Sequence, residues 1–436
     1  MGALENWLLE LDQPSQGFFR AFAALSRQPA GAVDAGREAV TRLAPRVDWA
    51  AYLPHIPHGL LGLQAVYRLR PLLPGPGFLR ILATQLHAFA HEARCPAARS
   101  LGAIGRGSGD WGNLAMALAA HRAAIAWGEA RAVEAPAFEH FLRLERAAEA
   151  DMANVGHKST LARMLGELFL ALGEPPEAGR LMLALAAWQC ASEPFDTFWH
   201  DRAGRRLADA PPVPHREAAQ SPEAHRAGVR EVCDTGLVDL LDRFSFRVRA
   251  AGGSGDLLAV LALAAAEKQL DARRDLEGKT TWTFVHLACL ARRVAQAGAG
   301  APASWVQAAA LVNLFPTGED EDRPRPQPPR QAPGDPLAAL LDAILDGEPE
   351  PAMGLAQAVL EGPGTDPLLR VLAEAASGND PAFNHSHQVL AVAAVADLLP
   401  HLPEVARGPV LVAMAKALAN SQGSSDLGRL ADAALQ

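Results

Sequence analysis

Apolar residues recur at three- and four-residue spacing along most of this 436-residue chain, and few folds accommodate such a pattern. The spacing is clearest in residues 161–172, 257–270 and 390–399, where alanine and leucine dominate. Only five isoleucines and two tyrosines occur in the chain, so residues that favour strands are scarce. The sequence therefore predicts an all-α protein, built as a multi-helix bundle or a helical-repeat-like array.

The charge balance and the N-terminal residues exclude several classes of protein. Forty basic residues against 49 acidic ones give a net charge of -9, which leaves no basic surface for phosphates. Glu5, Glu10 and Asp12 stand where a signal peptide carries basic residues, and no run of about twenty apolar residues occurs. The four cysteines are far apart in the sequence and include no CxxC pair, as is typical of a reducing compartment. We therefore expect a cytoplasmic protein with neither a nucleic-acid nor a membrane partner.

One segment, residues 316–336, interrupts the helical pattern with prolines and charges of both signs. Proline lacks the backbone N–H that a helix needs, and the segment offers no apolar face to bury. The sequence predicts a linker or loop here, dispensable for folding over residues 317–335. It would separate a main helical region, residues 1–315, from a C-terminal helical unit, residues 337–436.

Four histidines share one feature: each comes early in an apolar segment that is rich in small residues and predicted to be helical. They are His58, His157, His286 and His385. The first two are 99 residues apart, as are the last two, and the pairs are offset by 228 residues. This spacing is that of an internal two-fold duplication in which each half gives two histidines to one interior site.

A metal ion would satisfy several buried imidazoles together. An unpaired polar group in an apolar interior costs about 1–3 kcal/mol, and the start of a helix favours the neutral ring that can bind a metal. Imidazoles with few carboxylates suit iron, copper or zinc better than magnesium or calcium. We expect the ring nitrogens of at least three of the four to lie within about 4–6 Å of one another. For each ring alone, the alternative is that it caps a helix or bonds to a backbone carbonyl.

Four further residues are candidates for the same site. His87 and His91 form an HxxxH pair on one helix face, a spacing that can bind a metal. His387 follows His385 by two residues, so only one of the two can face the interior unless the helix begins later. Lys279 shares a face with His286, seven residues on, although a salt bridge to Asp275 or Glu277 is the simpler interpretation.

Three segments, HGLLGLQAVYRL, GKTTWTFVHLACLARRV and NHSHQVLAVAAV, resemble the questin oxidase-like proteins. Fungal members are similar in placing a lysine seven residues before a histidine, as Lys279 precedes His286. The resemblance implies a non-heme iron site with histidine ligands, and oxygen-dependent cleavage or oxygenation of aromatic polyketides in secondary metabolism. Family members place a second histidine near the position of Gln64, and a lysine at that of Gln388.

Two classes of function follow from these observations. The first is a metal-dependent oxidoreductase or oxygenase, with non-heme iron and no organic cofactor, acting on a hydrophobic small molecule of the aromatic polyketide class. The second is a non-catalytic helical-repeat scaffold or binding protein, because stacked helices of this composition make interaction surfaces without chemistry. No catalytic residue is assigned from the sequence.

Overall fold

The structure is a computed structural model, and it describes most of the chain. The described residues are 2–15, 17–47, 58–93, 107–149, 157–192, 205–271, 279–314, 334–378, 386–422 and 426–436. The predicted linker at 316–336 lies outside them except for its last three residues, and so does His385.

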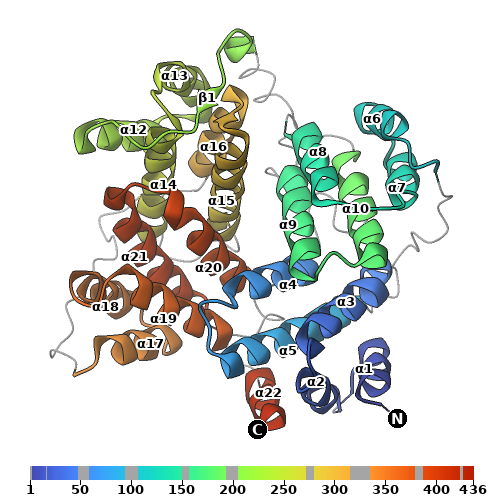
Figure 1. Cartoon of the computed structure of the whole chain (residues 1–436). Coiled ribbons are helices and arrows are strands. Elements are labelled where there is room, and N and C mark those ends of the chain that lie inside the picture. Colours follow the sequence, from blue (N-terminus) through green and yellow to red (C-terminus); the bar gives the residue numbers. More distant parts are fainter. Residues whose placement is uncertain are drawn as a thin grey trace. The chain divides into compact units, whose positions relative to one another are not determined.

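The chain divides into two compact units (Figure 1). Unit 1 comprises Met1–Asp196, Asp380–Ser386 and Ser425–Gln436, and unit 2 comprises Thr197–Asn379 and His387–Ser424. Both consist of helices, which confirms the predicted all-α class. The described strands are β1 (Val213–Pro214) and β2 (Ala299–Gly300), a short antiparallel pair in unit 2. None of the described helices is long and apolar enough to cross a lipid bilayer.

Unit 1 is built around α4, which has almost no solvent-facing side. Every residue from 59 to 67 of this helix is buried, and α4 packs against α5 and α9. The helices of this unit are α1 (Ala3–Asp12), α2 (Phe18–Ser26), α3 (Gly31–Leu43), α4 (His58–Leu69), α5 (Gly75–Glu92), α6 (Trp111–Ala119), α7 (Ala123–Arg131), α8 (Phe138–Ala148), α9 (His157–Ala171), α10 (Pro176–Cys190) and α22 (Leu427–Leu435).

Unit 2 is centred on two packed pairs, α15 with α20 and α14 with α21. Helices α20 and α21 thus share a core with α14 and α15, and α22 belongs to unit 1, whereas the sequence prediction set residues 337–436 apart as a C-terminal unit. The helices of this unit are α12 (Pro222–Asp234), α13 (Leu237–Ala250), α14 (Ser254–Asp271), α15 (Lys279–Ala297), α16 (Pro302–Asn313), α17 (Pro336–Leu345), α18 (Pro349–Glu361), α19 (Thr365–Gly378), α20 (His387–Leu398) and α21 (Glu404–Asn420).

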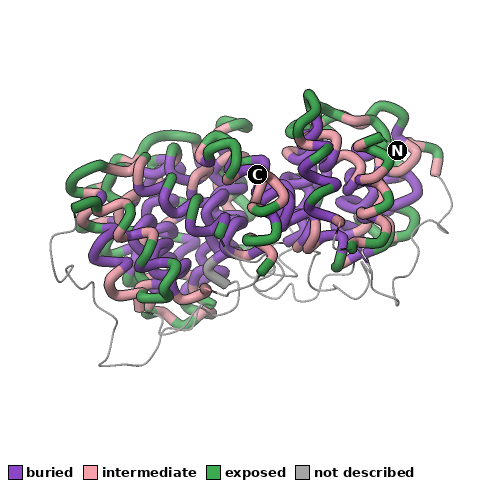
Figure 2. Tube along the Cα trace, turned by 90° about the horizontal axis from the view of Figure 1, so that it is seen from below, coloured by how far each residue is buried: buried purple, intermediate pink, exposed green. Residues whose placement is uncertain are grey.

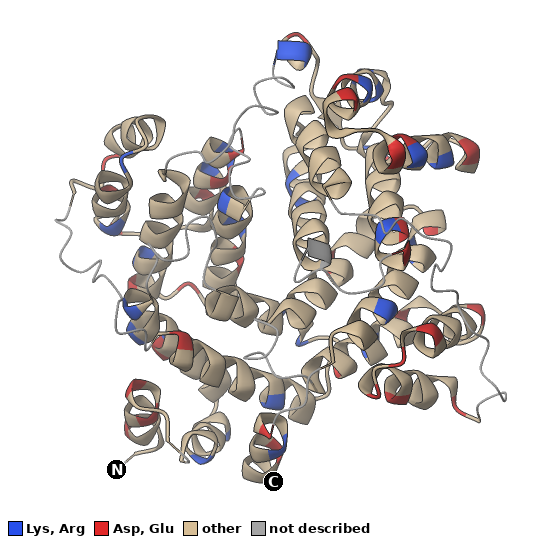
Figure 3. Ribbon diagram, turned by 180° about the vertical axis from the view of Figure 1, so that it is seen from behind, with Lys and Arg blue, Asp and Glu red and all other residues tan. Residues whose placement is uncertain are grey.

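Local sequence explains where several helices begin. Ser221 and Asp335 accept hydrogen bonds from first-turn N–H groups of α12 and α17, and a proline follows each of these caps. Within each unit, buried residues line the helix faces that meet one another, and exposed residues lie on the outer faces (Figure 2). Acidic and basic residues are interspersed along the helices, between long stretches of uncharged residues (Figure 3).

Candidate functional site

The start of α4, which carries His58, is held by a carboxylate from the end of α5. Glu92 accepts hydrogen bonds from the backbone N–H of His58 at 3.2 Å and of Gly59 at 2.9 Å. These N–H groups have no partner within the helix, and the positive end of the helix dipole also favours a negative charge here. Glu92 therefore fixes the backbone that carries the His58 ring.

Two glycines allow α5 to lie directly on this end of α4. A Cβ atom at Gly59 would come within 3.0 Å of the Phe89 Cα and 2.4 Å of a Glu92 oxygen. At Gly62 it would come within 2.5–2.6 Å of all three carboxamide atoms of Gln85. A larger residue at Gly59 would therefore press on the backbone of α5, and one at Gly62 would displace the Gln85 carboxamide.

The Gln85 carboxamide joins two segments that are far apart in the sequence. This fully buried side chain donates to the Gly59 carbonyl at 2.8 Å and accepts from the Ser386 hydroxyl, also at 2.8 Å. Ser386 is 2% exposed and has a φ of 64°, in the left-handed region that a helix cannot include. Helix α20 accordingly begins at His387. Gly59 and Ser386 are the residues that follow His58 and His385.

His157 opens α9 in a different part of unit 1, against the end of α10. Its side chain is 2% exposed, and the next residue, Lys158, is 1% exposed and donates to the Ser192 carbonyl at 2.6 Å. The Cys190 thiol contacts the carbonyl of Lys158 at 3.8 Å. The first turn of α9 is thus both polar and buried, as the sequence predicts for His157.

Further along α9, charged side chains form a buried chain that crosses three helices. Arg163 donates to Glu145 of α8 at 2.8 Å, and these side chains are 4% and 2% exposed. Arg163 also lies 3.6 Å from Glu167, which accepts from Gln64 of α4 at 2.9 Å. Burying charges is tolerated only when they are paired in this way. These buried ion pairs and the Gln64 hydrogen bond therefore fix α9 relative to α4 and α8.

The HxxxH pair lies on the side of α5 that faces away from α4. The His87 and His91 ring centroids are 4.5 Å apart, so the structure brings the two rings together. His87 stacks on Phe19 of α2 with centroids 5.3 Å apart. At 100° per residue His87 is about 200° around the helix from Gln85, the residue that contacts α4. His87 therefore packs against aromatic side chains of α2, whereas His91 is exposed.

In unit 2, α15 carries the candidate ligand His286 and α20 begins with the candidate His387. His286 is 6% exposed in α15. The backbone carbonyl of His387 accepts a hydrogen bond from the Thr281 hydroxyl at 3.1 Å. The His387 ring meets the Trp282 ring edge-on, with the centroids 6.5 Å apart. His387 therefore packs against α15. Lys279 is the first residue of α15, and the structure describes its backbone but not its side chain.

The expected convergence of four histidines remains a prediction. His58 and His157 belong to unit 1, His286 belongs to unit 2, and His385 lies outside the described residues. Within the part of the chain that the structure describes, no group of three or more His, Cys, Asp or Glu side chains is placed to hold a metal.

Sequence reasoning did not single out Glu92, Gln85 or Ser386. A signal for the first two was present, because Gly59 and Gly62 lie three residues apart on one helix face and indicate a close helix–helix contact there. Nothing local marks Ser386, which is 301 positions from Gln85.

Comparison of the chain with protein-family models, curated proteins and solved structures found no match.

Proposed function

We propose that the protein is a metal-dependent oxidoreductase with non-heme iron, acting on a hydrophobic small molecule. The observation that carries the proposal is the Gln85 carboxamide, which hydrogen-bonds both to Gly59 and to Ser386. The residues that follow two of the predicted ligands, His58 and His385, are thereby joined through one side chain inside unit 1. The aromatic polyketide class of substrate comes from the family resemblance alone.

The donor chemistry of this region fits a late first-row metal. His58 is the first residue of a helix, and His157 holds the same position in α9, where the positive end of the helix dipole disfavours a charged imidazolium ring. Glu92 is occupied by two backbone N–H groups, so it serves to position His58. Imidazole ligands of this kind are those that iron accepts.

The chain's own contribution would be to orient the ligands and to exclude water. Glu92 and Gln85 hold the backbone beside His58, while the buried residues of α4 keep solvent away. Iron bound by neutral ligands keeps most of its positive charge and would supply the activation of oxygen. A water-poor surrounding of aliphatic side chains favours an apolar substrate.

Metal analysis after anaerobic loading with Fe(II) tests the proposal. We expect the wild-type protein to retain about one iron per chain, and His58→Ala, His157→Ala, His286→Ala and His385→Ala to lose it while helical content stays unchanged. His121→Asn is the matched control, because His121 is exposed and Asn tolerates its left-handed backbone, with a φ of 52°.

Two results would contradict the proposal. A wild-type protein that retains no transition metal would exclude the oxidoreductase and favour the helical scaffold. Equal retention in all four variants would show that other residues bind the metal.

A further inference from the structure

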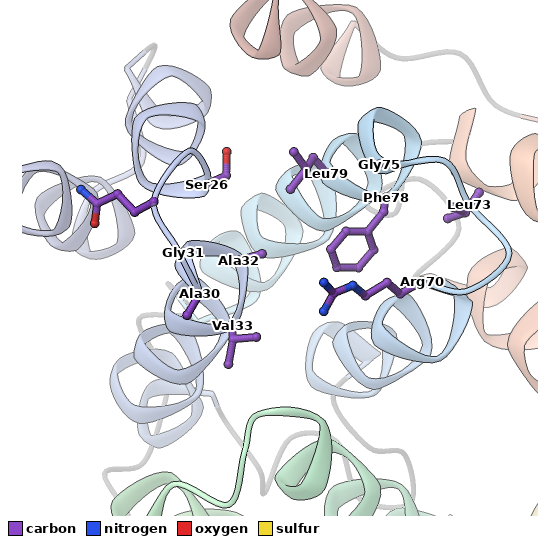
Figure 4. A pocket seen from close by; sticks show the side chains of 11 residues that line it. Ser26, Ala30, Gly31, Ala32, Val33, Arg70, Leu73, Gly75, Phe78 and Leu79 are labelled. Carbon is purple, nitrogen blue, oxygen red and sulfur yellow. The ribbon is translucent and has the colours of Figure 1, made fainter.

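Unit 1 contains a cavity of about 450 Å³ between the first turn of α3 and the turn that joins α4 to α5 (Figure 4). Its apolar lining includes Val33, Leu73, Phe78 and Leu79, and Arg70 contributes a charge. Ligand pockets for small molecules typically have volumes of about 300–1,000 Å³ and combine apolar walls with a few polar groups. The cavity has the size of such a pocket, is partly open to solvent, and also has Ser26 and Gln28 in its lining.

The walls of the cavity are tied together by the buried side chain of Tyr67. Its hydroxyl donates to the Ala32 carbonyl at 2.7 Å, which links α4 to α3. Its ring lies 6.0 Å from that of Phe78, which links α4 to α5. Burial raises the pKa of Tyr67, so the hydroxyl keeps its proton and remains a donor. The cavity is therefore preformed rather than dependent on a ligand.

Arg70 brings a positive charge to one side of this cavity. Its guanidinium lies over the Phe78 ring, 5.3 Å from the centroid, and Figure 4 shows it extending toward Val33. Within the described part of the chain no carboxylate pairs with Arg70, and Asp34, in the first turn of α3, is bound to Arg37 at 3.2 Å. An exposed guanidinium that lies over a ring can still present N–H groups to an anion.

We infer that this cavity binds a small carboxylate with an apolar body. Arg70 would pair with the carboxylate in a charge-assisted hydrogen bond, and the body would rest on Leu73, Leu79 and Val33. An inorganic anion would leave these apolar walls uncovered, and an uncharged ligand would leave Arg70 without a partner. The inference is independent of the proposed iron site, because Arg70 and the cavity contribute none of its predicted ligands.

Fluorine NMR with 4-fluorobenzoate tests the inference on the full-length chain. We expect the fluorine line to broaden on addition of wild-type protein and to recover as unlabelled benzoate is added. In Arg70→Gln, binding should weaken by about tenfold, the loss of one charge-assisted bond at a solvent-accessible cation. Arg70→Lys should retain part of the affinity. Arg20→Gln, an exposed arginine of α2 outside the cavity, is the matched control and should bind like wild type.

The uncharged isostere 4-fluorobenzamide and inorganic phosphate separate the two parts of the inference. Equal binding of the amide and the acid would overturn the role of Arg70, and so would equal binding of the acid to wild type and Arg70→Gln. Displacement of the acid by phosphate at matched concentration would show that the apolar walls contribute nothing. Unchanged melting temperatures of the variants would establish that each result concerns binding and not folding.

Discussion

Replacing Gln85 with leucine tests the contact on which the proposed function depends. Leucine has a similar volume, but it can neither donate to the Gly59 carbonyl nor accept from Ser386. Each lost hydrogen bond in a buried position costs about 1 kcal/mol, so the free energy of unfolding of unit 1 should fall by roughly 2 kcal/mol. For a unit of this size that corresponds to about 4–8 °C in melting temperature.

Hydrogen exchange locates the effect. In Gln85→Leu, backbone amides at the start of α4 and around residue 386 should exchange faster, while α8 should not change. Iron retention should fall in parallel, since the two segments would no longer be held together. Thr84→Val is the matched control, because Thr84 is 1% exposed and bonds only to carbonyls of its own helix.

Gly62→Ala perturbs the same carboxamide without removing it. The added Cβ would lie 2.5 Å from the Gln85 Nε2, so the side chain must shift. We expect the same local increase in exchange as in Gln85→Leu. Wild-type stability and iron content in both variants would refute the reasoning. Reduced stability with full iron content would show that the contact is structural and does not support a metal site.

Two further predictions concern unit 2. Burial lowers the pKa of Lys416 to about 8, from 10.5. Between pH 8 and 10.5 the unfolded chain therefore binds more protons than the folded one. The free energy of unfolding should rise by up to about 3 kcal/mol over this pH range. Lys416→Met should lack this rise in urea titrations at several pH values, and an unchanged rise would contradict the assignment. Asp256 lies 3.3 Å from the His225 Nε2 and accepts from two backbone N–H groups, with both side chains at most 3% exposed. Asp256→Ala should lower the free energy of unfolding by about 3 kcal/mol, and a loss below about 1 kcal/mol would refute a structural role.

Sequence periodicity was sufficient to predict the class of fold and the starts of several helices. His58 and His157 open α4 and α9, as expected. The partners of these helices could not be predicted, because α4 is apolar on nearly every side and its pattern favours no single contact face. Helix α20 begins after Ser386 because the backbone of Ser386 is left-handed. The sequence around His385 and His387 gives no sign of this conformation.

The order of segments along the chain has a consequence for folding. Unit 1 takes its last helix, α22, from residues that follow all of unit 2, and α22 packs against α5, where Arg80 and Asp432 are 3.5 Å apart. During synthesis, the first 196 residues therefore leave the ribosome long before their final packing partner does. Such long-range closure slows folding and leaves apolar surface on α5 and α2 uncovered in the meantime. The nascent chain would be most prone to aggregation while unit 2 is being made.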